Sequence, residues 1–122
     1  MILLDTCILI DILRGRPEAL ALDARFGDGV SMSVISIQEL LAGVRPKETK
    51  NVEALIAKAI RISVDEPIAR RAGDLLRQYR PSHGLDPNDS LIAATAQLSG
   101  AELITCNLKH FPMFPDLERP YP

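Results

Sequence analysis

Three acidic side chains have the residue type and the positions to act together chemically. Asp5 follows the apolar residues 1–4, and Glu39 lies one turn into the helix predicted after residues 30–33. Asp89 lies in the first turn of an alanine-rich helix. In a parallel sheet the junctions between strands and helices lie along one edge. We therefore expect the side chains of Asp5, Glu39 and Asp89 to meet in space.

A cluster of three carboxylates favours a divalent cation. Two carboxylates 4 Å apart repel each other by about 4 kcal/mol at an effective dielectric near 20, and a divalent cation removes that cost. Carboxylate oxygens suit Mg²⁺ or Mn²⁺, and Mg²⁺ is commonly held by one or two carboxylates together with water and phosphate oxygens. The chemistry that this cluster predicts is hydrolysis of a phosphate ester by metal-activated water.

Each acid also has a purely structural interpretation. Asp5 could cap a helix, and Glu39 could complete a Ser-x-x-Glu capping box with Ser36. Asp89 could complement the helix dipole beside the cap residue Asp86. Residue type and spacing alone leave both interpretations open.

The segments around these acids alternate between strand-like and helix-like patterns. Apolar residues spaced three and four apart, with Asp, Pro or Gly at the segment ends, predict helices between short apolar strands. Strands are expected at residues 1–4, 30–33 and 103–105, with 62–64 either a very short strand or an extended connection. Helices are expected near residues 8–13, 20–26, 35–42, 52–60, 65–79 and 86–99. This alternation predicts an α/β fold around a short, mainly parallel sheet.

Glycine and proline residues predict where some of the helices end. Gly43 is expected to cap the helix before it, and residues 81–84 to break the chain after the helix that begins at Asp65. The proline-rich tail after Phe111 is expected to be irregular, with an edge strand near Leu117.

The composition predicts a folded domain rather than a disordered chain. The 122 residues are 47% hydrophobic and 25% charged, and the net charge is −2, so any binding of nucleic acid must depend on a local basic patch. Cys7 and Cys106 belong to no metal-ligand pattern, which predicts two free thiols in a reducing cytoplasm. The N-terminus lacks a basic leader region, and no run of 18 apolar residues occurs, so we expect neither export nor membrane insertion.

Four sequence blocks occur in order along essentially the whole chain. They are Leu-Leu-Asp-Thr-Cys-Ile-Leu-Ile-Asp near residue 1, Ile-Ser-Ile-Gln-Glu-Leu-Leu-Ala-Gly around Glu39, Asn-Asp-Ser-Leu-Ile-Ala-Ala-Thr-Ala around Asp89, and Leu-Ile-Thr-Cys-Asn-Leu-Lys-His-Phe near the end. Together they resemble the blocks of PIN-domain ribonucleases, and in particular the toxins of VapBC toxin-antitoxin systems. The ordered set of four is specific, whereas any one block would be a weak signal.

The resemblance implies a three-layer α/β/α PIN-like domain over residues 1–122 and a Mg²⁺- or Mn²⁺-dependent endoribonuclease. It also implies a cytoplasmic homodimer, held inactive by an antitoxin whose tail fills the active-site groove. By position Asp5, Glu39 and Asp89 match the acids that serve the family as catalytic residues and metal ligands. A PIN-like module that binds RNA or protein without catalysis is the alternative function.

Asn107 departs from the family pattern, because many members carry a fourth aspartate at that position. Asn107 can still offer a neutral oxygen or orient a water, but its presence puts a second metal ion in doubt. Asp116, in the tail, is the alternative source of a fourth carboxylate.

A few polar residues near these acids are further candidates. Thr6 and Thr105 could contact a metal-bound water or a phosphate, although each also suits an ordinary position at a helix start or strand end. Arg14 and Arg16 are candidate contacts to the RNA backbone. Asp11 is expected to be solvated or paired with Arg14.

The two histidines, His83 and His110, are too few and too isolated to form a zinc site or a histidine-based nuclease site. Both are expected to be surface or loop residues.

Overall fold

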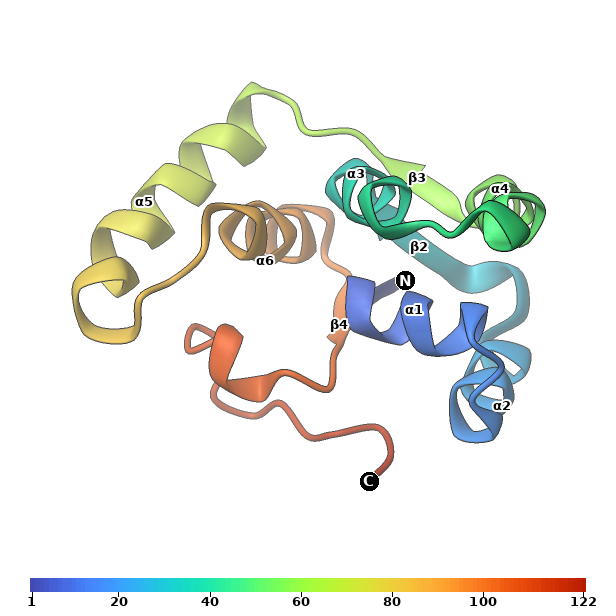
Figure 1. Ribbon diagram of the computed structural model, residues 1–122. Helices are drawn as coiled ribbons and strands as arrows, with labels where there is room; N and C mark the ends of the chain where they lie inside the picture. The colour runs from blue at the N-terminus through green and yellow to red at the C-terminus, as the bar shows by residue number, and fades with distance from the viewer.

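A computed structural model describes residues 1–122 and has a three-layer α/β/α architecture (Figure 1). The middle layer is a four-stranded sheet in which every strand pair is parallel. The strand order is β3-β2-β1-β4, with β1 at Ile2–Leu4, β2 at Val30–Ser33, β3 at Ile60–Ile62 and β4 at Glu102–Ile104. The predicted fold class is confirmed.

The first strand, β1, is central because β2 and β4 pair with its two edges. Leu3 lies opposite Ser31 of β2 and Leu103 of β4. Successive side chains of a strand point to opposite faces, so Leu3 belongs to one hydrophobic core and Leu4 to the other. Both side chains are fully buried, which explains why the sequence of this strand is uniformly apolar.

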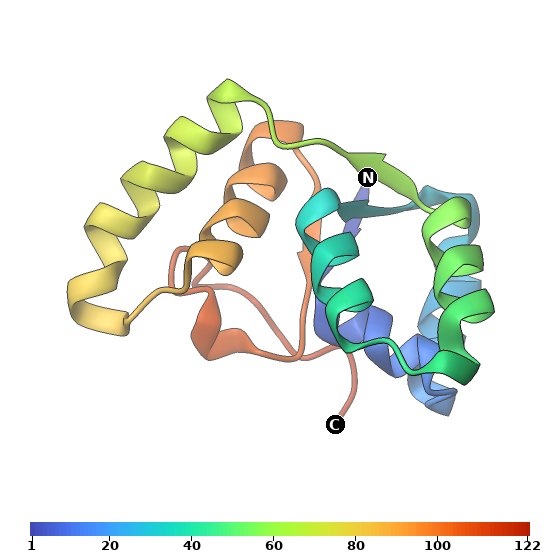
Figure 2. The same ribbon diagram turned by 45° about the horizontal axis from the view of Figure 1, so that its top comes forward.

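Helices cover both faces of the sheet (Figure 2). Helices α1, α2 and α4 share the core that contains Leu4, and α5 and α6 share the core that contains Leu3. Helix α3 follows directly from the end of β2 and contacts α1, α4 and α6. The helices span Thr6–Leu13 (α1), Pro17–Phe26 (α2), Val34–Gly43 (α3), Thr49–Lys58 (α4), Glu66–His83 (α5) and Pro87–Ser99 (α6).

Several helix ends follow from the sequence signals. The carboxylates of Asp65 and Asp86 accept backbone N–H groups in the first turns of α5 and α6. Gly84 and Gly100 end the same two helices with φ angles of +61° and +70°, a conformation that favours glycine.

The prediction was wrong at β3. Ile60 was expected on the apolar face of a helix, but α4 ends at Lys58 and Ile60 begins the strand. Ile60 lies opposite Ser31 of β2, so pairing with the sheet overrides the helical spacing. The strand ends at Ile62, and the residues after it are an extended connection.

The predicted ends of α3 were also wrong. The hydroxyl of Ser33 accepts the backbone N–H of Ile35, so Ser33 caps the helix and no capping box forms between Ser36 and Glu39. Gly43 is the last residue of α3, and it lacks the positive φ that a glycine cap adopts.

Helix α5 is longer than predicted, because it continues through Pro81 to His83. The fixed φ of proline is compatible with a helix, and Gly84 supplies the actual stop. The tail beyond residue 111 forms no strand near Leu117. No helix, α5 included, is long and apolar enough to cross a membrane.

Candidate active site

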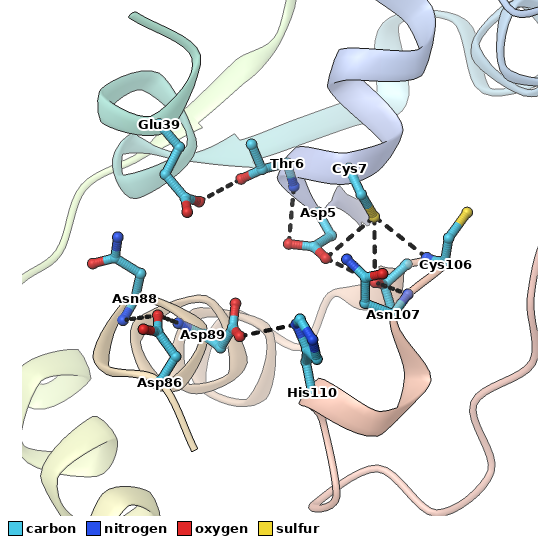
Figure 3. A network of polar contacts seen from close by, with 11 residues as sticks. Asp5, Thr6, Cys7, Glu39, Asp86, Asn88, Asp89, Cys106, Asn107 and His110 are labelled. Atoms are coloured by element: carbon cyan, nitrogen blue, oxygen red, sulfur yellow. Dashed lines mark hydrogen bonds and ion pairs between the residues drawn. The ribbon is translucent and has the colours of Figure 1, made fainter. Parts of the chain in front are cut away.

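The structure brings the three predicted acids to one hollow of about 430 Å³, which we call the acidic pocket. Asp5 follows β1, Glu39 lies on α3, and Asp89 lies in the first turn of α6. Figure 3 shows their carboxylates directed toward a common space. The full lining is Asp5, Thr6, Cys7, Ile10, Glu39, Asp86, Asp89, Asn107 and His110.

Asp5 is almost completely buried, with 4% of its surface exposed, and both of its carboxylate oxygens accept hydrogen bonds. Oδ1 accepts the backbone N–H of Thr6 at 2.9 Å, which makes Asp5 the N-cap of α1. Oδ2 accepts the hydroxyl of Thr105 at 2.7 Å and the thiol of Cys7 at 3.4 Å. Asp5 therefore caps a helix and lines the acidic pocket at the same time.

Glu39 is oriented by a short chain of hydroxyl groups. The hydroxyl of Thr6 donates to Oε1 of Glu39 at 2.7 Å. The hydroxyl oxygen of Thr6 also lies 2.8 Å from Oγ of Ser36. Because the single hydroxyl proton of Thr6 goes to Glu39, Ser36 is the donor to Thr6. Ser36 is completely buried, so water does not compete for its hydroxyl.

The two threonines therefore position carboxylates. The sequence suggests Thr6 and Thr105 as contacts to a metal-bound water or a phosphate, whereas in this structure their hydroxyl protons go to Glu39 and Asp5. The hydroxyl of Thr105 also accepts the backbone N–H of Asn107 at 3.0 Å, which fixes the loop after β4.

Asp89 has an unfavourable setting for its negative charge. Burial, followed by the negative charge of Asp5, raises the pKa of Asp89 to about 6. The charges of Asp86 and Glu39 act in the same direction, and His110 acts against them. The neighbouring carboxylates thus lie close enough to disfavour the ionisation of Asp89, a condition that a bound cation relieves.

His110 and Asp86 also line the acidic pocket, and neither is among the site residues predicted from sequence. Nδ1 of His110 lies 3.3 Å from Oδ2 of Asp89. His110 belongs to a short 3₁₀ turn, Leu108–His110, and only the folding of this turn against α6 brings it there. Asp86 was recognised as the cap of α6, and the same position places it three residues from Asp89 at the rim.

The two candidates for a fourth residue of the site, Asn107 and Asp116, lie in different hollows. Asn107 lines the acidic pocket, whereas Asp116 lines a separate hollow along β4 with Glu102 and Leu103. Asp116 therefore does not supply a fourth carboxylate, and that alternative is wrong. The carboxylate that does join the three predicted acids is Asp86.

The basic residues near α1 have other partners than predicted. Asp11 pairs with Arg16 at 3.6 Å and accepts the hydroxyl of Tyr121 at 2.7 Å, so the predicted pairing with Arg14 is wrong. Arg16 also bonds Glu18 at 3.0 Å, and its guanidinium stacks over Tyr121. Arg16 thus ties the C-terminal residues to α1. Arg14 follows α1 at the end opposite Asp5, about 12 Å away along the helix axis.

The donor set of the acidic pocket fits a hard cation, although the side chains do not form a closed cage. No three Asp, Glu, His or Cys side chains lie close enough together to enclose a metal ion. Mg²⁺ does not need such a cage, because it usually retains several waters and uses only one or two carboxylates. Asp5, Glu39 and Asp89 offer oxygen ligands of the type it prefers.

Comparison with known proteins gives a consistent family assignment. A family model described as "PIN domain" matches residues 2–113. Ribonuclease VapC19 of Mycobacterium tuberculosis is 48% identical over 125 residues, covering 99% of this chain and all of that protein. Ribonuclease VapC10 of the same organism is 43% identical over 124 residues, covering 99% and 93%. A toxin-antitoxin complex from Klebsiella pneumoniae contains a chain with a TM-score of 0.82 and 34% identity, covering 99% of this chain and 98% of that one.

Proposed function

The chain belongs to the PIN domain family, and from this premise we propose that it is a VapC-type toxin that hydrolyses phosphodiester bonds within RNA. The names of its relatives, Ribonuclease VapC19 and VapC10, support an RNA-cleaving activity. The observation that carries the proposal is the acidic pocket. Three carboxylates from segments far apart in the chain, those of Asp5, Glu39 and Asp89, face one hollow.

We further propose that the activity depends on Mg²⁺ or Mn²⁺, with Asp5, Glu39 and Asp89 as the ligand residues. The raised pKa of Asp89 supports this, because the carboxylates repel one another without a compensating positive charge. The chemistry that a divalent cation supplies in such a site is activation of water and stabilisation of negative charge on phosphate oxygens.

Side chains and backbone groups around the acids orient the carboxylates that would hold the cation. Thr105 and the backbone N–H of Thr6 hold the two oxygens of Asp5, while the Thr6 hydroxyl holds one oxygen of Glu39. Such outer contacts fix the orientation of ligand carboxylates before substrate arrives. Asn107, at the rim, offers an amide group that can donate to a phosphate oxygen.

The proposal includes a protein partner. The similar chain from Klebsiella pneumoniae was solved within a toxin-antitoxin complex. We propose that this chain likewise binds a cognate antitoxin, acts as a homodimer, and works in the cytoplasm where its RNA substrate is found.

The decisive experiment is cleavage of structured RNAs, including tRNA, by purified protein freed of any antitoxin. Reactions contain Mg²⁺, Mn²⁺ or EDTA, and they compare the unmodified protein with Asp89→Asn. Asp116→Asn is the matched control, because it makes the same chemical change in a different hollow. Thermal melts establish that every variant is folded.

Metal-dependent cutting that is lost in Asp89→Asn and retained in Asp116→Asn supports both the activity and its site. Cutting that persists in Asp89→Asn, or that continues in EDTA, contradicts the proposed site. Absence of cutting in all samples, with RNA still bound, favours a binding module instead.

A further inference from the structure

A second hollow, of about 370 Å³, adjoins the acidic pocket and has the opposite charge character. The two hollows share Asn107 and His110 as a common wall. Lys109 and Arg119 contribute their cationic side chains to the second hollow, which we call the basic hollow. No carboxylate lines it.

Both cations of the basic hollow are available to a ligand. Lys109 and Arg119 are exposed, and neither forms an ion pair. Five of the 14 Lys and Arg residues form ion pairs and nine do not, so what distinguishes Lys109 and Arg119 is their position beside the acidic pocket. The paired residues are Arg16, Arg45, Lys58, Arg70 and Arg77. An anion that binds Lys109 and Arg119 therefore breaks no salt bridge of either residue.

The negative charge of the acidic pocket opposes the binding of nucleic acid unless cationic side chains lie nearby. Its four carboxylates, Asp5, Glu39, Asp86 and Asp89, repel a polyanion, and the net charge of the chain is also negative. A strand of nucleic acid can place one phosphate among these carboxylates only if its neighbouring phosphates are attracted elsewhere. The basic hollow lies next to the acidic pocket, because Asn107 and His110 line both.

We propose that the basic hollow binds a backbone phosphate of the RNA strand next to the bond that lies in the acidic pocket. This inference rests on the proposed function and adds the path of the strand, from the acidic pocket across Asn107 and His110 to Lys109 and Arg119. Contacts to phosphates fix the position of a strand without reading its sequence. The basic hollow thus acts on RNA affinity and register and leaves the chemical step to the acidic pocket.

The test measures RNA affinity separately from cleavage. Lys109→Ala and Arg119→Ala are introduced into Asp89→Asn protein, and binding of a fluorescein-labelled single-stranded RNA is followed by anisotropy over a range of salt concentrations. Lys50→Ala, which removes an exposed unpaired lysine on α4, is the control for loss of one charge. The same substitutions in otherwise unmodified protein give KM and kcat for cleavage.

Each substitution in the basic hollow is expected to weaken RNA binding about tenfold and to reduce the slope of log Kd against log salt by about 0.7, the value for one lost phosphate contact on a single strand. KM rises while kcat at saturating RNA stays near that of the unmodified protein, and Lys50→Ala changes neither. Arg119→Lys restores part of the affinity, because it restores the charge without the planar guanidinium.

The outcomes separate this inference from the proposed function. If the unmodified protein cuts RNA and the Lys109 and Arg119 variants bind and cut equally well, the inference is overturned and the function stands. If the protein binds RNA through the basic hollow but never cuts it, the function fails and the inference stands. Variants that bind RNA normally but lose affinity for the antitoxin overturn the inference by assigning the hollow to the protein partner.

Discussion

The hydroxyl of Thr105 donates a 2.7 Å hydrogen bond to the carboxylate of Asp5, 100 residues earlier in the chain. This bond joins the end of β4 to the end of β1, and it is buried. Because Asp5 is only 4% exposed, water replaces the lost donor poorly if the hydroxyl is removed. The contact therefore matters to stability as well as to the geometry of the acidic pocket.

We expect Thr105→Val to destabilise the fold by about 1–3 kcal/mol, because Oδ2 of Asp5 then keeps only the weak thiol donor of Cys7. Urea unfolding measures the change. Thr105→Ser keeps the hydroxyl and is expected to remain within about 1 kcal/mol of the unmodified protein. Equal losses for Val and Ser would show that the hydroxyl is not the cause.

A second prediction concerns Glu39, which the hydroxyl of Thr6 orients. Thr6→Val removes that donor with little change in volume, and we expect RNA cleavage to fall roughly 10- to 100-fold, the usual effect of losing a group that orients a metal ligand. Thr6→Ser is expected to retain most of the activity. The concentration of Mn²⁺ needed for half-maximal cleavage is measured in both, and it is expected to rise only in the valine variant.

A third prediction follows from the raised pKa of Asp89. The folded state holds the proton of this carboxyl more tightly than the unfolded state, so its contribution to stability is full at low pH and is lost as pH rises through about 6. Asp89→Asn stays uncharged at every pH. Its stability relative to the unmodified protein is therefore expected to increase by roughly 1–2 kcal/mol between about pH 4.5 and pH 7.5, after allowance for solvent screening.

The measurement for Asp89 is denaturant unfolding of both proteins at the two pH values in EDTA. Contributions of titrating groups remote from Asp89 are common to both and cancel in the difference, whereas the loss of the pairing with His110 is part of the measured difference. A stability difference that is the same at both pH values would mean that folding does not raise the pKa of Asp89.

Addition of Mn²⁺ provides a fourth prediction. A cation that binds only the folded state stabilises it by about 2.7 kcal/mol at a hundredfold excess over its dissociation constant. The melting temperature of the unmodified protein is expected to rise with Mn²⁺, and that of Asp5→Asn to rise much less. Asp116→Asn serves again as the control, because its carboxylate lies outside the acidic pocket.

The fifth prediction is chemical. Burial and the negative charge of Asp5 raise the pKa of the Cys7 thiol to about 12. Because the thiolate is the reactive form, alkylation of Cys7 by iodoacetamide near neutral pH is expected to be about a thousandfold slower than for an unperturbed thiol. Mass spectrometry of folded and urea-unfolded protein measures this difference, and Asp5→Asn is expected to speed the reaction in the folded state.

The positions of the acids could be predicted from sequence because each follows a strong local signal. The apolar run before Asp5 and the Asp-Pro start of α6 before Asp89 are patterns of adjacent residues, and they locate both side chains. The parallel connection of the strands then brings these junctions to one edge of the sheet. The approach of these acids to one another could therefore be predicted without knowledge of individual side-chain contacts.

The partners of the acids could not be predicted in the same way. His110 reaches Asp89 only through a turn that has no apolar periodicity, and the chain from Ser36 through Thr6 to Glu39 joins two helices. Ile60 was misplaced because its spacing matched a helix while its hydrogen bonds belong to the sheet. Such contacts depend on tertiary packing, which local pattern does not contain.

The central position of β1 has a consequence for the synthesis of the protein. Strand β1 gains its second neighbour only when Glu102–Ile104 has emerged from the ribosome, and Asp5 gains the Thr105 hydroxyl only after that. Pairing across such a sequence separation makes folding late and slow compared with folding through local contacts. A nascent or truncated chain that ends before β4 also lacks Thr105, Asn107 and His110, so its acidic pocket is incomplete.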